Sequence, residues 1–142
     1  MLTKVEREMI HNIVDFRAVK ARDVMVPMEK VRGVRSDASV DELLAICRDT
    51  DLERLPVITA KGEVAGLIDV FEVLVDGSRR GTVNVYSRRI ITVAPDEEGY
   101  QVIRKLRAAR ITLAAVIGSE SQPVGIVSSE DLVGRLVKVA VA

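Results

Sequence analysis

The chain repeats its own apolar pattern. When residues 34–74 are moved forward by 59 positions, apolar residues fall on apolar residues without a gap. Val34 then falls on Val93, and Gly66 falls on Gly125. A repeat of this size cannot bury its hydrophobic face alone, so it must pack against its twin, and the seam between the twins forms a symmetric pair of clefts. We therefore expect one domain built from two similar halves, with its function located in those clefts.

Composition narrows the class of function. A chain of 142 residues suits one compact domain, which at this size buries roughly 70% of the surface of its unfolded form. Aromatic residues make up only 3% and there is no Trp, so few side chains can stack on bases as they do in single-strand binders. Lys plus Arg (21) balances Asp plus Glu (21), so no net positive charge attracts a polyanion. We expect no nucleic-acid partner.

Single residues give little support for catalysis or metal binding. The lone Cys47 excludes an internal disulfide, and its place in a helical pattern with Leu43 and Leu44 indicates a core thiol. His11 has no second histidine or cysteine nearby. Charged residues interrupt the apolar runs that could cross a bilayer, and the start of the chain lacks the apolar stretch of a signal peptide. We expect a soluble chain with no catalytic and no metal-binding residues.

Both halves predict the same order of elements: strand, helix, strand, strand, helix. In the first half we expect strands near residues 31–34, 55–59 and 64–68, and helices near 39–48 and 70–75. In the second half we expect strands near 90–93, 113–117 and 124–127, a helix entered at residue 96, and a last helix to about residue 138. The predicted organisation is an N-terminal helix and linker (1–18), a first repeat (19–76), a connector (77–89), and a second repeat with the C-terminal helix (90–142).

The strand-to-helix junction of the second half carries polar groups suited to a nucleotide. The sequence there is Gly125-Ile126-Val127-Ser128-Ser129-Glu130-Asp131. A helix N-terminus leaves free backbone amides and a partial positive charge, which suit a phosphate or a sugar hydroxyl. Asp131 can accept from both hydroxyls of a ribose, and the Ser128 hydroxyl can turn to a phosphate or sugar oxygen. The same two residues also form an ordinary Ser-x-x-Asp helix cap, and the sequence leaves both interpretations open.

The first half differs at the same junction. Asp69 and Glu72 stand where Ser128 and Asp131 stand in the second half, and two carboxylates repel an anion, although Asp69 suits a helix cap. We expect this half to bind nucleotide poorly or not at all. Arg54, just before a strand, can bind phosphate oxygens through its guanidinium or remain a solvated surface side chain.

These features together resemble a tandem pair of cystathionine-β-synthase-type (CBS) domains, a Bateman module. Within that superfamily the chain looks most like the CBS pair of CorC/HlyC-type and CNNM-type magnesium and cobalt transport proteins. The narrower likeness is carried by Glu6-Arg7-Glu8-Met9-Ile10, Val14-Asp15-Phe16, Asp23-Val24-Met25-Val26-Pro27, Arg54-Leu55-Pro56-Val57 and the junction at residues 125–131.

The resemblance implies an α+β fold in which two β-α-β-β-α repeats pack about a pseudo-twofold axis, with an extra N-terminal helix. It implies a homodimer formed through the CBS helices. It also implies an adenosine nucleotide (ATP, ADP or AMP), with magnesium as an accompanying ion, in one cleft. The residues that it implies for nucleotide binding are Ser128 and Asp131 at the ribose, Lys20 and Val24 at the base and sugar, and Arg54 with Leu52, Glu53 and Pro56 near the phosphates.

The function implied by the resemblance is non-catalytic regulation of a metal-ion transport or efflux protein, with transport itself carried out by another domain. The chain would then be cytoplasmic, or the cytosolic part of an inner- or plasma-membrane protein. Glu53 departs from the family, which often has a small hydroxyl residue there, and adds negative charge on the phosphate side unless magnesium offsets it. The alternative function is a ligand-free structural and dimerisation module attached to a membrane protein.

Overall fold

The contacts of the chain divide it into two compact units. The computed structural model describes residues 3–4, 17–77 and 81–141. Unit 1 combines Met1–Glu29 with Ile91–Ala142, and unit 2 is Lys30–Ile90. The predicted N-terminal helix over residues 3–16, with His11 and two of the motifs that carry the resemblance, lies outside the described residues apart from positions 3 and 4. Each unit is considered by itself below.

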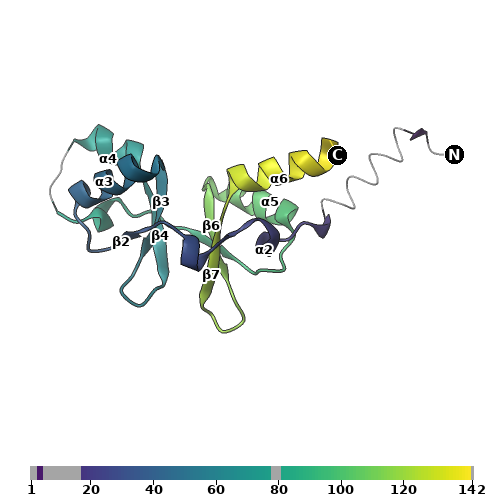
Figure 1. Ribbon diagram of the computed structural model, residues 1–142, viewed down its shortest axis with the longest axis horizontal. Coiled ribbons are helices and arrows are strands. Elements are labelled where there is room, and N and C mark those ends of the chain that lie inside the picture. Colours follow the sequence, from purple (N-terminus) through teal and green to yellow (C-terminus); the bar gives the residue numbers. More distant parts are fainter. Residues whose placement is uncertain (1–2, 5–16, 78–80, 142) are drawn as a thin grey trace. The chain divides into compact units, whose positions relative to one another are not determined.

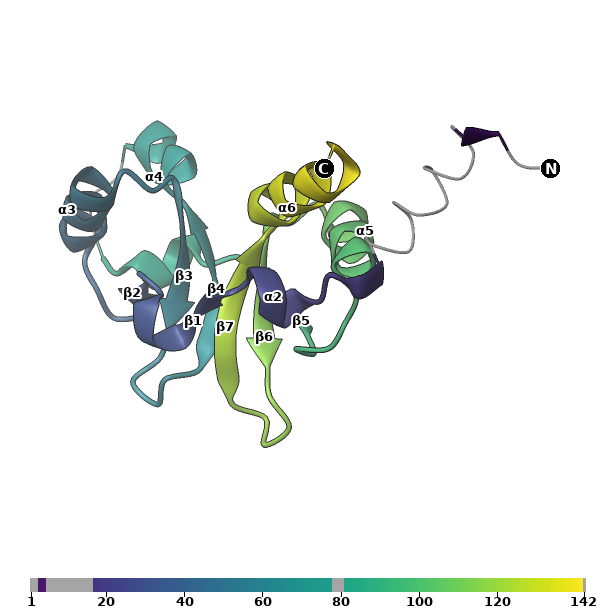
Figure 2. The ribbon, with the colours of Figure 1, turned by 45° about the vertical axis from the view of Figure 1, so that its right-hand side comes forward.

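Unit 2 has the predicted order of strand, helix, strand, strand, helix. Its elements are β2 (Val34–Arg35), α3 (Val40–Thr50), β3 (Arg54–Ile58), β4 (Val64–Asp69), α4 (Val70–Asp76) and the 3-10 helix η2 (Val83–Tyr86). The sheet order is β2-β3-β4, with β2 parallel to β3 and β3 antiparallel to β4. Helices α3 and α4 contact each other, and in Figures 1 and 2 both lie at the end of the β3–β4 hairpin opposite its turn.

Local sequence explains where the elements of unit 2 begin and end. The Ser39 hydroxyl accepts a hydrogen bond from the Glu42 amide at 3.1 Å, which caps α3 as the Ser-x-x-Glu motif predicts. Asp51 ends α3 in the left-handed conformation. Gly62 takes a φ of 81° in the β3–β4 turn, where a glycine avoids the steric penalty of a side chain. The buried core consists of Val34, Ala38, Val40, Leu43, Leu55, Val57, Ile68, Val73 and Val83.

Unit 1 repeats this architecture and adds a segment from the start of the chain. Its elements are α2 (Ala21–Val24), β1 (Val26–Pro27), the 3-10 helix η1 (Met28–Lys30, whose last residue falls in unit 2), β5 (Ile91–Val93), α5 (Gly99–Ala109), β6 (Leu113–Ile117), β7 (Pro123–Ser128) and α6 (Ser129–Val141). The sheet order is β1-β7-β6-β5. Strands β5 and β6 are parallel, and the other neighbours are antiparallel. The buried core consists of Ala21, Val93, Val102, Leu106, Ala114, Val116, Val127 and Leu132.

A short segment covers the outer side of the last strand in each unit. In unit 1, β1 pairs with β7, and Val26 lies opposite Ile126. In unit 2, Arg88 lies opposite Leu67 of β4 in an isolated antiparallel bridge. The latter segment belongs to residues 77–89, which the sequence indicates as a connector, and Val83 within it is fully buried in the core of unit 2. Val83 and Arg88 of this stretch therefore contribute to the packing of unit 2.

Buried apolar side chains of the chain form these two cores. No helix among the described residues is long and apolar enough to span a bilayer. The order of elements predicted for each half is confirmed by the two sheets and their helices.

Candidate functional site

The junction of β7 and α6 in unit 1 is held by two hydrogen bonds. The Ser129 amide donates to the Thr112 carbonyl oxygen at 2.9 Å, which ties the start of α6 to the residue before β6. The Ser128 hydroxyl accepts from the Asp131 amide at 3.0 Å. The predicted Ser-x-x-Asp cap is therefore confirmed. A hydroxyl that accepts from a backbone amide still has its own proton to donate, so the cap leaves Ser128 able to contact a ligand.

Two polar groups at this junction have no partner within the described part of the chain. The Asp131 side chain is exposed, and no described residue donates a hydrogen bond to its carboxylate or pairs with it. The Thr112 hydroxyl oxygen is buried and makes no hydrogen bond to any described residue. A buried hydroxyl without a partner costs about 1–3 kcal/mol, so such groups are uncommon and suggest a missing donor or acceptor.

Lys20 and Val24 lie in the α2 segment of the same unit. The Ala21 amide donates to the Glu97 carbonyl at 2.9 Å, and the Arg22 amide donates to the Pro95 carbonyl at 3.0 Å. These bonds fix α2, which contacts α5, α6 and β7. Lys20 and Val24 are both partly exposed. Unit 1 therefore holds four of the predicted nucleotide-binding residues on elements that contact one another.

The junction of β4 and α4 in unit 2 has the same backbone arrangement. The Val70 amide donates to the Glu53 carbonyl at 2.9 Å, as Ser129 does to Thr112. The Asp69 carboxylate accepts from the Phe71 amide at 2.9 Å, so the predicted cap by Asp69 is confirmed. Here the carboxylates have partners.

Glu72 is bound by an arginine that follows α4 in the chain. The Nε atom of Arg88 donates to both carboxylate oxygens of Glu72, at 2.6 and 2.9 Å, and Arg88 Nη2 also contacts Glu72. This hydrogen bonding, with a further contribution from the charge of Asp69, raises the pKa of Arg88. The carboxylate at the position equivalent to Asp131 is thus neutralised within unit 2.

The other four predicted residues lie around the start of β3 in unit 2. Arg54 Nε is 3.8 Å from Asp69 Oδ2, and the two side chains are 43% and 36% exposed. Leu52 and Glu53 are exposed, whereas Pro56 is buried in the sheet. A phosphate could therefore reach Arg54 but could contact Pro56 only after a rearrangement.

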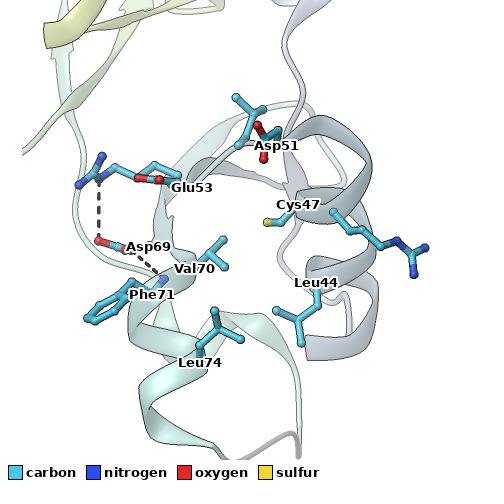
Figure 3. A pocket seen from close by; sticks show the side chains of 11 residues that line it. Leu44, Cys47, Asp51, Glu53, Asp69, Val70, Phe71 and Leu74 are labelled. Atoms are coloured by element: carbon cyan, nitrogen blue, oxygen red, sulfur yellow. Dashed lines mark hydrogen bonds and ion pairs between the residues drawn. The ribbon is translucent and has the colours of Figure 1, made fainter.

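Leu52, Glu53 and Arg54 also line a cavity of about 660 Å³ in unit 2. Figure 3 shows Leu44 and Cys47 of α3 facing Val70 and Leu74 of α4 across it, with Asp51 and Glu53 at one end. Partial burial raises the pKa of the Cys47 thiol, which keeps it protonated and poorly nucleophilic. The cavity joins an apolar wall to a rim of charged side chains.

Sequence reasoning missed Thr112. The 59-residue shift that defines the repeat places Thr112 on Glu53. Glu53 is the position where the related family often has a small hydroxyl residue. Applying the same family pattern to the second half of the sequence would have identified Thr112 as a candidate site residue. No group of three or more His, Cys, Asp or Glu among the described residues has the geometry to hold a metal ion.

The comparison with protein families gives two matches to the same domain. The CBS-domain family matches residues 21–76 and 83–138. The chain belongs to the CBS-domain family. Each CBS match begins with a short helical segment, α2 or η2, and these contact the last strands β7 and β4 respectively. The predicted CBS pair and its α+β fold class are confirmed.

Two curated relatives of this CBS pair are proteins of different kinds. The chain is 27% identical over 125 residues to a homoserine O-acetyltransferase of Methanococcoides burtonii, covering 87% of this chain and 25% of that protein. It is 23% identical over 135 residues to the magnesium and cobalt efflux protein CorC of Pasteurella multocida, covering 92% of this chain and 45% of that protein. The chain thus spans less than half the length of these relatives.

A solved structure shows the same fold. The CBS domain of a bacterial CNNM/CorC-family Mg²⁺ transporter in complex with ATP superposes with a TM-score of 0.84 at 22% identity, covering 94% of this chain and 97% of that one.

Proposed function

We propose that this chain is a regulatory CBS pair that binds an adenosine nucleotide and controls a magnesium or cobalt transport protein. Its likeness to CorC and to the ATP-bound CBS domain of a CNNM/CorC-family transporter supports this function. The observation that carries the proposal is the junction at α6, where the buried Thr112 hydroxyl and the Asp131 carboxylate beside the capped helix start have no partner among the residues that the structure describes.

Nucleoside recognition is assigned to unit 1. The Asp131 carboxylate accepts from the two ribose hydroxyls, and charged acceptors make the stronger hydrogen bonds. The Ser128 hydroxyl supplies a donor to a sugar or base atom, and the Thr112 hydroxyl, which is buried in the free chain, supplies a second donor once ligand binding has moved its side chain. Lys20 and Val24 border the base and sugar, where the Val24 side chain supplies apolar contact. These groups fit a nucleoside because they combine one anion, two hydroxyls and an apolar surface.

Phosphate recognition is assigned to Arg54, with Leu52, Glu53 and Pro56 as its neighbours. A guanidinium binds phosphate oxygens through two parallel hydrogen bonds. Glu53 places a negative charge beside Arg54, and a magnesium ion bound to the phosphates would offset it. Pro56, buried in β3, acts by shaping the backbone that presents Arg54.

The role of the chain is to change the state of a partner without catalysing a reaction. A ligand shifts an equilibrium between two arrangements only by its difference in affinity for them, typically 1–3 kcal/mol. The relatives' greater length supports a transport domain outside this chain, so the module would act as the cytosolic part of a membrane protein.

Assembly is proposed to occur through the CBS helices of two copies. Helix α4 exposes apolar side chains, with Phe71 72%, Leu74 55% and Val75 70% exposed, and α6 exposes Val133 and Val137 at about half of their surface. Exposed apolar patches of this kind favour protein contacts. The partner proposed for these helices is a second copy of the chain.

A ligand-free structural module is the second candidate. The observation that favours it is the pairing of Arg54 and Arg88 with carboxylates of unit 2, which reduces the positive charge available to phosphates. Such a module would dimerise and position a membrane domain without responding to nucleotides.

Calorimetry and thermal unfolding with adenosine, AMP, ADP and ATP, each with and without magnesium, test the proposal. A ligand present at about 100 times its Kd adds about 2.7 kcal/mol to the free energy of unfolding. Asp131→Asn is expected to weaken binding by about 10- to 100-fold, because it removes a charged acceptor. Glu72→Gln, the same kind of change at the equivalent position of unit 2, is the matched control and leaves the affinity for adenosine unchanged. No response to any nucleotide would favour the structural module.

A further inference from the structure

Arg54 and Asp69 are held opposite each other by the sheet. Arg54 begins β3 and Asp69 ends β4, and the two residues are direct partners in the antiparallel ladder. The Cβ atoms of two residues at such positions lie close together on one face of the sheet, so their side chains can interact. Their ion pair is long, with 3.8 Å between Arg54 Nε and Asp69 Oδ2, so the guanidinium is held close to the carboxylate without a hydrogen bond between these atoms.

The two members of this pair differ in how firmly they are fixed. Asp69 Oδ1 accepts from the Phe71 amide at 2.9 Å, so the start of α4 orients the carboxylate. The other neighbouring guanidinium, Arg88, is occupied by Glu72. Arg54 has the ion pair with Asp69 and a side chain that is 43% exposed. A competing anion can therefore draw Arg54 away while Asp69 stays in place.

We propose that Asp69 is a specificity-determining residue that competes with ligand phosphates for the Arg54 guanidinium and so weakens the preference of the chain for ATP over nucleotides with fewer phosphates. Carboxylate and phosphate oxygens bind a guanidinium in the same way, so Arg54 cannot serve both fully. The inference rests on the proposed function, because it takes Arg54 as the phosphate-binding residue.

The second half of the chain lacks this competition. The residues equivalent to Arg54 and Asp69 are Leu113 and Ser128, which are also direct partners in their ladder. Neither carries a charge. The competition for the guanidinium therefore depends on the side chains of unit 2 and not on the backbone geometry that the two units share.

The test measures the Kd of adenosine and of ATP without magnesium, at one fixed low salt concentration, for the wild-type chain and for Asp69→Asn. Asparagine still accepts from the Phe71 amide, so the helix cap is kept while the charge is removed. Asp69→Asn is expected to tighten ATP binding about fivefold, the scale of an exposed ion pair, and to leave the Kd of adenosine within about twofold. Asp37→Asn is the matched control, since Arg35 and Asp37 form another exposed ion pair in unit 2.

The double variant Arg54→Gln with Asp69→Asn identifies the route of the effect. If Asp69 acts through Arg54, the gain in ATP affinity disappears in the Arg54→Gln background. A gain that persists there, an equal gain for adenosine, or no gain at all overturns this inference while leaving nucleotide binding intact. If the wild-type chain and Asp69→Asn bind neither adenosine nor ATP, the proposed function and this inference both fail.

Discussion

The helix starts of α4 and α6 share their backbone geometry and differ in their polar side chains. In each, the first amide of the helix donates at 2.9 Å to a carbonyl that precedes the neighbouring strand, from Val70 to Glu53 and from Ser129 to Thr112. In each, the residue before the helix caps it through a side-chain oxygen. The duplication has therefore preserved the backbone geometry of this strand-to-helix junction in both units.

The polar side chains at the two junctions differ in whether they are free to bind a ligand. At α4, Arg54 lies beside the Asp69 carboxylate and Arg88 binds Glu72. At α6, the equivalent Asp131 carboxylate has no partner among the described residues. The charged groups at the α4 junction are paired within unit 2. Within the described residues, the Asp131 carboxylate and the buried Thr112 hydroxyl at the α6 junction have no partner. A shared fold thus predicts two possible sites, whereas the charge pairing favours only one.

The largest expected effect tests the shared backbone geometry. At Gly66 a Cβ atom would lie 2.6 Å from the Arg88 carbonyl oxygen, and at the equivalent Gly125 it would lie 2.8 Å from the Val26 carbonyl oxygen. Gly66→Ala and Gly125→Ala are each expected to lower the free energy of unfolding by about 2–3 kcal/mol, as overpacking does. Urea unfolding measures this loss.

Gly134 supplies the control for these variants. It lies inside α6, and nothing would lie within 4 Å of an added Cβ. Gly134→Ala should therefore raise the free energy of unfolding by about 0.5–1 kcal/mol, because alanine favours the helix. If Gly66→Ala or Gly125→Ala did not lower the free energy of unfolding, the segments that contain Arg88 and Val26 would not lie as close to β4 and β7 as the structure places them.

The next prediction concerns Thr112 at the α6 junction, where one substitution should change stability and nucleotide affinity in opposite directions. Thr112→Val keeps the shape of the side chain and removes the buried unpartnered hydroxyl, so the free energy of unfolding should rise by about 1 kcal/mol. Nucleotide affinity should fall by about tenfold because one hydrogen bond to the ligand is lost. Thr92→Val, on the exposed residue Thr92 of β5, is the control and should change neither. A loss of stability in Thr112→Val would mean that the hydroxyl has a partner in the free protein.

A smaller effect compares the two caps directly. Asp69→Ala and Ser128→Ala each remove the acceptor for a helix amide and should each cost about 1 kcal/mol of stability. Asn at either position should restore most of that loss, because it also caps helices. Added salt should reduce the cost of Asp69→Ala more than that of Ser128→Ala, since only Asp69 carries a charge. Equal salt dependence would show that the charge of Asp69 contributes nothing to the cap.

Local patterns in the sequence predicted the elements and caps because their causes are local. The Ser39, Asp69 and Ser128 caps each join residues two or three positions apart, and the strand and helix periods follow from the side chains themselves. The repeat also identified Asp131 as the residue equivalent to Glu72.

The features that the sequence did not predict depend on contacts between positions that are far apart in the chain. Arg88 binds Glu72 across 16 residues, from a stretch whose Gly, Ser and Arg content is typical of a connector. Strand β1 has only two residues, too few for a periodic signal, and its pairing with β7 spans about a hundred positions. Thr112 required comparing the halves at a position where one side chain is charged and the other is not.

The smallest effect compares equivalent positions of α3 and α5. Cys47 is partly buried at the cavity of unit 2, whereas Leu106, 59 positions later, is fully buried. Burial raises the pKa of Cys47, so its neutral form is favoured in the folded state. Stability from this source is present below the ordinary thiol pKa and is lost as the pH rises through the raised value.

Labelling by iodoacetamide at pH 8 reads out this difference, because the thiolate is the reactive form. We expect Cys47 to react more slowly in the folded chain than in urea, with a pH profile displaced upward. A chain carrying Cys47→Ala with Leu106→Cys should be labelled more slowly still before unfolding, since that position is closed to solvent. Equal rates at the two positions would mean that the cavity beside α3 gives the reagent no access, and the two helices would then bury this position alike.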